Sequence, residues 1–286
     1  MSPRIFGILL FLLALLLFAI LDASAKYLTA FYAVPFLVWA RYAVHLVVML
    51  VAVAPSQGRA LIATRHPWLM VVRALLLCAL TLFAQLAFRV LPLAETTAIV
   101  FITPLLVALL AGQMLGETVT KKSWLATLAG FAGVMLITRP GSNLDPTGVA
   151  CALAGAVCYA LYQILTRRLA ASETPLRQLF YTALIGTLAM SLVLPGVWPA
   201  TLPTPFELLL LVGLGLCGGI GHFLLIRALR ETPASLLAPL LYVQLVWAAL
   251  LGWWVFGDVP DAWTALGMGI IGASGLSLVL GRRKTV

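Results

Sequence analysis

The stretch AFRVLP at residues 87–92 recurs as ALRETP at residues 228–233, at an offset of 141 positions. The same offset brings LGE at residues 115–117 onto FGD at residues 256–258. Recurrence of separate motifs at one spacing is typical of an internal duplication. We therefore predict two units of similar structure, residues 1–140 and residues 141–286.

The composition is far more apolar than that of a soluble protein. Of the 286 residues, 63% are hydrophobic and only 9% are charged. Soluble globular proteins are about half apolar and about one quarter charged. The composition therefore excludes a soluble enzyme, a nucleic-acid-binding domain and a disordered chain.

Long apolar runs, broken by charged residues, proline or glycine, predict ten transmembrane helices. They span residues 5–28, 34–54, 69–90, 93–115, 122–138, 147–168, 177–195, 206–228, 233–256 and 262–281. The first run is longer than the apolar core of a signal peptide, and the first unit of the duplication requires it as its first helix. It is therefore interpreted as an uncleaved span. The predicted fold class is an all-α polytopic protein of the lipid bilayer.

Lysine and arginine are distributed unevenly between the two ends of these helices. With a cytoplasmic N-terminus, fourteen fall on the inner side and only Lys26, Arg89 and Arg139 near the outer side, with Arg41 inside a span. An excess of positive residues in cytoplasmic loops is the usual arrangement. Both termini are thus predicted to be cytoplasmic, and the net charge of +9 requires no nucleic-acid partner. The inner residues are Arg4, Arg59, Arg65, Arg73, Lys121, Lys122, Arg167, Arg168, Arg177, Arg227, Arg230, Arg282, Arg283 and Lys284.

Each predicted unit contains five helices, so the second unit must enter the membrane from the opposite side. Inverted repeats of this kind are typical of secondary transporters, whose substrate site lies near the bilayer midplane between the halves. The sequence therefore predicts two inverted five-helix repeats and movement of a small molecule by alternating access.

The paired motifs resemble those of the drug/metabolite transporter superfamily, in its ten-helix branch with two EamA-type repeats. The resemblance rests on the stretch 89–95 leading into Gly116 and Glu117, and on 230–235 leading into Gly257 and Asp258. It implies an exporter of amino acids, aromatic ones included, or of other metabolites, in the bacterial inner membrane. It also implies that helices 1, 3, 4, 6, 8 and 9 surround a cavity from which helices 5 and 10 stand apart.

One feature departs from the pattern of that superfamily. The sequence has Thr103-Pro104 and Gln244-Leu245 at positions where Glu-Pro is often found. A carboxylate at that site is therefore missing from both halves.

Polar side chains within the apolar helices are the candidate site, because such groups are costly in lipid and usually face a cavity. On the third and sixth helices they lie at helical spacing and share one face. The repeat offset also pairs Thr81 with His222 and Thr103 with Gln244. The predicted substrate-binding residues are Tyr159, Tyr162, Gln163, Thr81, Cys78, Gln85, Phe101, Thr103, His222, Gln244 and Trp247.

These groups favour a small amphipathic metabolite. Amides, hydroxyls and imidazole can bind the carboxylate and amine of a zwitterion, and aromatic rings can contact its side chain. No cluster of buried arginine and lysine suited to a phosphorylated sugar is visible, so an amino acid is favoured; other metabolites, cationic compounds and sugars are the alternatives. Each polar residue also has a simpler interpretation as an interhelical hydrogen bond or packing contact.

Asp22 and Lys26 lie one helical turn apart, in the favourable order for an ion pair. They are predicted coupling or gating residues. The alternative is that the pair only neutralises two charges at the outer end of the first helix.

No catalytic constellation and no Walker motif are present, so neither an enzyme nor direct coupling to ATP is expected. The four cysteines lie inside apolar runs without zinc or disulfide spacing, and no cofactor or metal is expected. Small residues such as Gly130 and Gly269 on the fifth and tenth helices allow close approach, either within one chain or in a homodimer. A non-transporting scaffold is the remaining alternative.

Overall fold

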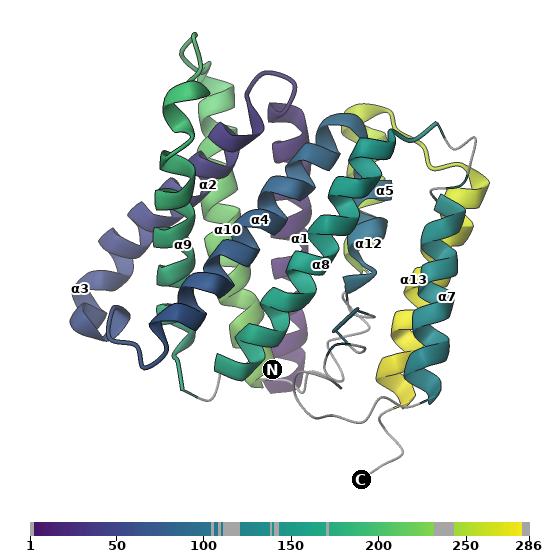
Figure 1. The fold of residues 1–286 in the computed structure, drawn as a ribbon, viewed down its shortest axis with the longest axis horizontal. Helices are drawn as coiled ribbons and strands as arrows, with labels where there is room; N and C mark the ends of the chain where they lie inside the picture. Colours follow the sequence, from purple (N-terminus) through teal and green to yellow (C-terminus); the bar gives the residue numbers. More distant parts are fainter. Residues whose placement is uncertain are drawn as a thin grey trace.

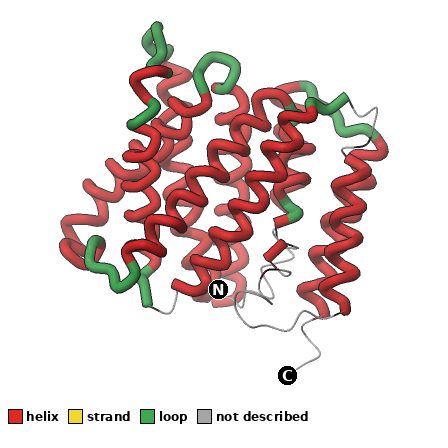
Figure 2. Tube along the Cα trace, in the orientation of Figure 1, coloured by secondary structure: helices red, strands yellow, loops and turns green. Residues whose placement is uncertain are grey.

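The computed structural model describes residues 3–103, 106–107, 110, 121–137, 139, 143–169, 172–231 and 243–281. Within these ranges every regular element is a helix, as Figure 2 shows in red. The α-helices are α1 (Pro3–Leu28), α2 (Val34–Val48), α3 (Ala54–Gln57), α4 (Pro67–Val90), α5 (Leu93–Val100), α7 (Lys121–Ile137), α8 (Pro146–Leu169), α9 (Pro175–Ser191), α10 (Pro205–Glu231), α12 (Val243–Phe256) and α13 (Ala262–Gly281).

Five helical segments have the length and hydropathy needed to cross a membrane. They are Ile5–Leu28, Val34–Leu61, Pro67–Val90, Pro146–Thr166 and Pro205–Leu225. Large apolar side chains such as Trp68 and Trp254, which are 72% and 81% exposed, stand on the outside of the bundle. An apolar exterior of this kind suits a bilayer rather than water.

Several helices begin one or two residues earlier than the apolar pattern predicted, because each starts at a proline. Pro67, Pro146, Pro175 and Pro205 occupy first helical positions. Proline is favourable there because its missing N–H would have no intrahelical partner and its φ is already helical.

The predicted helix over residues 34–54 is interrupted near its end. After α2, residues Met49–Val53 form a π-helical turn, and α3 follows. Pro55 explains the change, because it has no amide hydrogen to donate to the carbonyl of Val51 and so opens the regular ladder.

The fourth and ninth predicted helices are only partly described. Helix α5 ends at Val100, where the hydroxyl of Thr103 donates to the Val100 carbonyl at 2.6 Å. Residues 104–105, 108–109, 111–120 and 232–242 lie outside the described residues, and with them Pro104, Gly116 and Glu117.

The helices form a main bundle and a separate pair. In the bundle α1 packs on α10, α4 on α8, and α2 on α9 and α10. Figure 1 shows α7 and α13 side by side at one flank, in contact with the bundle mainly through α5. The start of α1 and the end of α13 lie at the same edge of the molecule. The fifth and tenth predicted helices therefore stand apart, as the family resemblance implies.

Backbone contact holds the α7–α13 pair together. A Cβ built on Gly267 would lie 2.7 Å from the Gly133 carbonyl oxygen, and one on Gly133 would lie 2.8 Å from that of Gly267. Only glycine allows helices to approach this closely. Gly269, which the sequence placed in the same ladder, instead faces open space.

Candidate functional site

The centre of the candidate site is a contact between α1 and α12. The Nε2 atom of Gln244 donates a hydrogen bond to Oδ2 of Asp22 at 3.2 Å. Both residues were predicted site residues, on separate grounds, and they are 222 positions apart. The structure therefore brings a carboxylate and an amide together inside an apolar bundle, where polar groups need a partner.

Arg41 extends from α2 toward the same region. Its side chain packs over Gly218 of α10, where an added Cβ would lie 3.3 Å from both Arg41 Nε and Leu21 Cδ1. The charge of Arg41 acts on Asp22, Tyr159 and His222. Glycine at 218 thus leaves room for a guanidinium beside the Asp22 turn of α1.

Aromatic rings surround these polar groups. The rings of Phe18 and His222 have centroids 4.9 Å apart, and those of Tyr159 and Tyr162 are stacked at 6.0 Å. The ring of His45 packs against Gly219 of α10, where a Cβ would lie 3.1 Å from its Cδ2 atom. Helices α1, α2, α8 and α10 thus contribute rings or imidazoles to this part of the bundle.

Arg73 corrects one part of the sequence analysis. It was assigned to the inner loops and helix ends, but it lies within α4 and is only 3% exposed. Its guanidinium donates to Tyr162 Oη and Thr166 Oγ1 on α8, each at 2.7 Å, and to the Gln178 carbonyl and Thr182 Oγ1 on α9. All four acceptors are neutral, so within the described part of the chain hydrogen bonds rather than a counter-ion hold this charge.

Arg73 and Arg41 both act electrostatically on His222. Arg73 is buried and Arg41 is half-buried; the expectation that the chain has no cluster of buried arginine and lysine suited to a phosphorylated sugar stays a prediction. Arg73 lies four, eight and twelve positions before Leu77, Thr81 and Gln85. This helical spacing places Arg73 on the polar face of the third predicted helix, and it is visible in the sequence.

The other predicted residues of α4 have different surroundings. The hydroxyls of Thr81 and Tyr42 lie 2.9 Å apart, and Cys78 packs in the same buried cluster as Tyr42. Gln85 is 2% exposed, and neither its Nε2 nor its Oε1 has a hydrogen-bond partner among the described residues. A buried amide without partners is rare because it loses its bonds to water.

Phe101 and Thr103 lie in the packing between α5 and α8. Phe101 belongs to a core cluster with Ala152 and Ala156 of α8, and the Thr103 hydroxyl also lies 3.2 Å from the Ala156 carbonyl. Gln163 and Trp247 are half-buried on α8 and α12. A substrate role for these four residues stays a prediction.

Lys26 does not form the expected ion pair with Asp22. Its Nζ donates to the Leu91 carbonyl at 2.7 Å and lies 3.5 Å from Oδ2 of Asp258, with the Phe256 ring below it at 5.1 Å. The lysine side chain reaches the end of α4 and the turn after α12, where its charge meets a carbonyl and a carboxylate. The predicted coupling or gating role of Asp22 and Lys26 stays a prediction.

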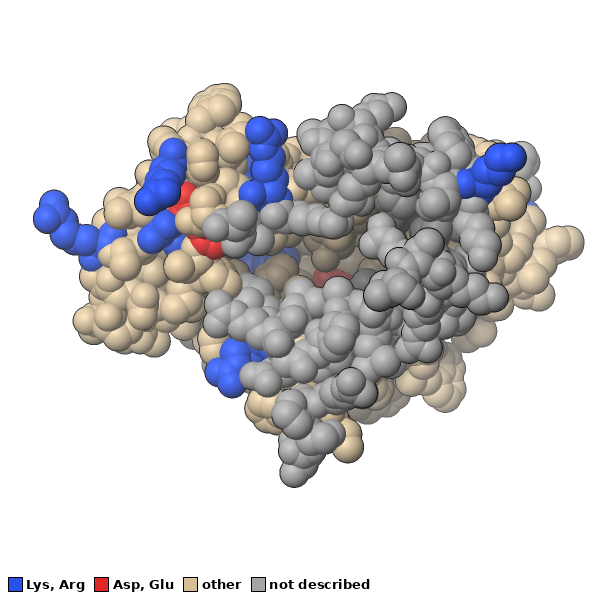
Figure 3. Space-filling model, turned by 90° about the horizontal axis from the view of Figure 1, so that it is seen from below, with Lys and Arg blue, Asp and Glu red and all other residues tan. Residues whose placement is uncertain are grey.

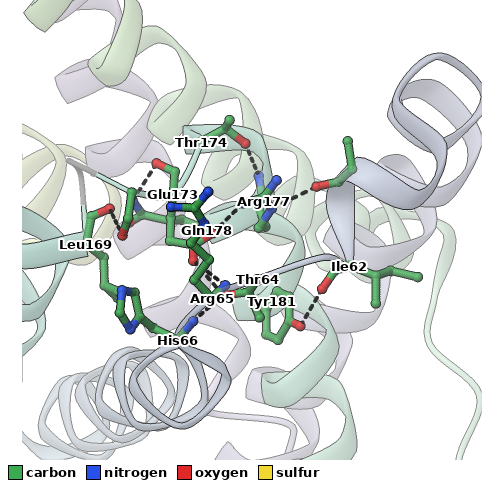
Figure 4. Close-up of polar contacts among 12 residues, drawn as sticks. Ile62, Thr64, Arg65, His66, Leu169, Glu173, Thr174, Arg177, Gln178 and Tyr181 are labelled. Atoms are coloured by element: carbon green, nitrogen blue, oxygen red, sulfur yellow. Dashed lines mark hydrogen bonds and ion pairs between the residues drawn. The ribbon is translucent and has the colours of Figure 1, made fainter.

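A polar cluster closes one end of the bundle between the segment before α4 and the α8–α9 turn (Figure 4). The carboxylate of Glu173 accepts from Thr64 Oγ1 at 2.6 Å, from the Arg65 amide at 3.1 Å and from Arg177 Nη1 at 2.5 Å. Burial alone would raise the pKa of Glu173, but the bonds from Thr64 and Arg177 outweigh it and hold the pKa below its usual range. We call this group the Glu173 latch.

A second contact joins the equivalent segments at the other end. The Tyr32 hydroxyl, in the turn between α1 and α2, donates to Glu207 Oε2 at 2.9 Å at the start of α10. Glu207 also accepts from the amide and hydroxyl of Thr204. Tyr32 and Glu173 are 141 positions apart, which is the repeat offset. We call this contact the Tyr32 latch.

The end of the bundle that carries the Glu173 latch has basic side chains around its periphery (Figure 3). Arg59 and Arg65 belong to the exposed segment between α2 and α4 on this side.

Comparison with known proteins identifies the family. Residues 5–139 and 146–280 each match the EamA-like transporter family. The chain belongs to this family. This EamA-like protein is thus a membrane transporter of the drug/metabolite transporter superfamily, and its bacterial relatives place it in the plasma membrane.

Curated relatives cover nearly the whole EamA-like chain. An S-adenosylmethionine uptake transporter of Rickettsia prowazekii is 28% identical and covers 98% of this chain and 94% of its own. A riboflavin transporter of Vibrio cholerae is 30% identical and covers 93% of this chain and 90% of its own. A pseudopaline exporter of Pseudomonas aeruginosa is 26% identical over 91% of both. These names do not support the narrower resemblance to aromatic amino-acid exporters.

A solved crystal structure shares the fold of this EamA-like protein. It superposes with a TM-score of 0.69, covers 98% of this chain and 99% of its own, and is 23% identical. At this identity the likeness shows the fold alone.

The residues missed in the sequence were those whose partners are distant along the chain. Arg41 was seen inside a span but given no role, and Tyr32 and Glu173 were not considered. The repeat offset connects the last two, so a search for equivalent polar residues at helix ends would have found the latches of the EamA-like protein.

Proposed function

We propose that this protein moves a small organic metabolite by alternating access, through a central site formed by Asp22, Gln244, Tyr159 and His222. The observation that supports the proposal best is the Asp22–Gln244 hydrogen bond, which joins the two halves within the apolar bundle. Polar pairs are expensive in this environment and mark substrate or ion pathways in transporters.

The packing of the helices supports an inverted-repeat architecture. Exchanging the two predicted units turns α1 into α8, α4 into α10 and α2 into α9. Under this exchange the α1–α10 contact becomes the α8–α4 contact, and α2–α10 becomes α9–α4. These two contacts between the halves therefore have counterparts, as expected when two repeats are related by a pseudo-two-fold axis.

The two latches support an alternating mechanism. Each joins the turn after the first helix of one repeat to the start of the third helix of the other repeat, and they lie at opposite ends of the bundle. Opening either end requires its own latch to separate. Breaking a few hydrogen bonds at one end while keeping those at the other is a small energetic change that substrate binding could drive.

The substrate class proposed is a metabolite that combines polar or charged groups with an aromatic or heteroaromatic ring. S-adenosylmethionine, named for one relative, contains an amino-acid head and an adenine ring, and riboflavin, named for another, contains a flavin ring. Stacked Tyr159 and Tyr162 offer an aromatic face, and Asp22 and Gln244 offer an acceptor and a donor. Aromatic amino acids belong to the same class, and other amino acids share their charged groups.

Export from the cytoplasm is proposed as the physiological direction, with both termini on the cytoplasmic side. The excess of lysine and arginine predicted at the cytoplasmic side supports this placement of the termini. It does not bear on the direction of transport, because an inverted repeat is nearly symmetric with respect to the membrane; export is proposed from the family resemblance. One relative is named for uptake and another for export, so the experiment must measure both directions.

The test is counterflow in proteoliposomes with purified protein. Labelled S-adenosylmethionine, riboflavin, amino acids, a cationic drug and a sugar are each loaded on either side of the membrane. Saturable exchange by wild type, lost in Asp22→Asn and in Gln244→Ala but kept in the exposed control Arg59→Gln, would support the proposal. Exchange of none of the compounds would contradict the substrate class, and unchanged exchange in both variants would contradict the site.

A further inference from the structure

Asp22 and Arg41 are an acidic and a basic side chain that face the same part of the bundle and do not form an ion pair with each other. The charge of Arg41 acts on Asp22, yet no ion pair joins them, and the polar contact of Asp22 is with Gln244. Arg41 has no hydrogen-bond or ion-pair partner among the residues whose side chains the structure describes. Opposite charges in an apolar surrounding usually pair directly, because isolated charges are strongly destabilised there.

The backbone of α10 holds the two residues in this arrangement. Gly218 receives both the Arg41 guanidinium and the side chain of Leu21, the residue before Asp22. Gly215, one turn earlier, contacts Val44 and the Arg41 carbonyl, where an added Cβ would lie 2.5 Å and 2.9 Å away. The close approach of α2 to α10 therefore fixes the position of Arg41 relative to α1.

The charges around this point favour a bound carboxylate. Four of the five N–H donors of Arg73 are occupied by neutral acceptors on α8 and α9. Arg41 is therefore the guanidinium that can bind a ligand beside Asp22. Guanidinium groups bind carboxylates through two parallel hydrogen bonds, and Arg41 has its donors free for this among the described residues.

We propose that Arg41 and Asp22 form a zwitterion site, in which Arg41 binds the carboxylate and Asp22 binds the ammonium group of an amino-acid head. The inference rests on the proposed function and specifies which part of the substrate is recognised. The ammonium and carboxylate groups of the substrate lie between Asp22 and Arg41, and the hydrogen bond from Gln244 holds the Asp22 carboxylate in place. The ring or side chain of the substrate then lies toward Tyr159 and His222, on which Arg41 also acts.

The test uses two matched series of unlabelled competitors against proteoliposome exchange. One is S-adenosylmethionine, its decarboxylated form and its 2-oxo acid analogue, and the other is phenylalanine, phenethylamine and phenylpyruvate. Each series contains a zwitterion, an amine without the carboxylate and an acid without the amine. The inhibition constant of each compound is measured for wild type, Arg41→Gln, Asp22→Asn and the control Arg59→Gln.

The expected result is a crossed pattern. Arg41→Gln weakens the zwitterion and the acid by about 10- to 100-fold and leaves the amine unchanged, because a charge-assisted hydrogen bond to the carboxylate is lost. Asp22→Asn weakens the zwitterion and the amine and leaves the acid unchanged. Arg41→Lys keeps the preference for the carboxylate with weaker binding, and Arg59→Gln matches wild type.

Other patterns overturn the proposal. Equal weakening of all three compounds in both variants would make Arg41 and Asp22 structural, and unchanged constants would remove them from the site. If a variant does not purify as a folded protein, the wild type still decides, because equal inhibition by zwitterion, amine and acid contradicts a zwitterion site. Should neither series compete while riboflavin exchanges, the zwitterion site fails and the proposed transport function stands.

Discussion

Tyr32 and Glu173 occupy equivalent positions in the two repeats, 141 residues apart, and each hydrogen-bonds to the segment that starts the third helix of the other repeat. Their chemistry differs. Tyr32 makes one neutral-to-charged bond to Glu207, whereas Glu173 accepts three bonds, one from an arginine. The end closed by Glu173 should therefore be the more stable of the two.

Weakening the two latches should shift the protein in opposite directions. Glu173→Gln removes the charge that Thr64 and Arg177 bind, and should expose the segment 58–66. Tyr32→Phe removes the bond to Glu207 and should expose the start of α10. Hydrogen–deuterium exchange of the two segments measures both effects, and each variant is the control for the other. Increased exchange of both segments in both variants would mean general loosening rather than separate gates.

The Glu173 latch should weaken in acid. The pKa of Glu173 is lower in the folded state than in the unfolded state. Its contribution to the free energy of unfolding is therefore present above the unfolded pKa of about 4.3 and is lost as the pH falls through the folded pKa. The difference in thermal unfolding temperature between wild type and Glu173→Gln should be constant at neutral pH and shrink in acid. A difference that grows on acidification would contradict the assigned bonds.

Arg73 should respond differently to a charged and to an uncharged replacement. Arg73→Lys keeps a buried charge but cannot reproduce the planar set of bonds to Tyr162, Thr166 and Thr182, while Arg73→Met removes the charge. We expect the lysine variant to be the less stable of the two. A buried ammonium group without a counter-ion destabilises the fold more than the loss of the arginine donors from four neutral acceptors. Thermal unfolding in detergent ranks them. The opposite order would show that a counter-charge holds Arg73.

Gln85 should be dispensable for stability. Both ends of its amide are buried without partners, so Gln85→Leu should stabilise the protein by about 1–3 kcal/mol. Thr81→Val is the matched control, because the Thr81 hydroxyl is bonded to Tyr42 and its loss should destabilise. If Gln85→Leu is more stable but loses exchange activity, the amide is used by substrate. A less stable Gln85→Leu would show that the amide has a partner after all.

The α7–α13 pair should depend on one glycine and not on its neighbour. Gly267→Ala puts a Cβ 2.7 Å from the Gly133 carbonyl oxygen and must push the helices apart, whereas Gly269→Ala has nothing within 4 Å. We expect the first to destabilise and the second to be neutral or to stabilise by about 0.5–1 kcal/mol. Unfolding temperatures of the two variants measure the contrast. Equal effects would show that the backbones do not touch.

The helices and their approximate ends were predictable because they depend on local sequence. Apolar runs of about 20 residues determine which segments cross the membrane, and prolines determine where several begin. The break after α2 was missed, although Pro55 stands in the sequence, because the hydropathy of the run continues through it. The polar faces of the third and sixth helices followed from helical spacing alone.

The partners of the polar residues depend on how the helices pack and could not be predicted from local sequence. Lys26 has Asp22 one turn away, yet it bonds to Leu91 and approaches Asp258, because its long side chain reaches the helix end. Asp22 is left to Gln244, 222 residues further along, and Arg73 is buried by acceptors from α8 and α9. Which residues are polar within apolar helices can be read from the sequence, since that is a property of each position. Which of them meet depends on how the helices pack, because a buried polar group is satisfied by whatever donor or acceptor the neighbouring helix presents.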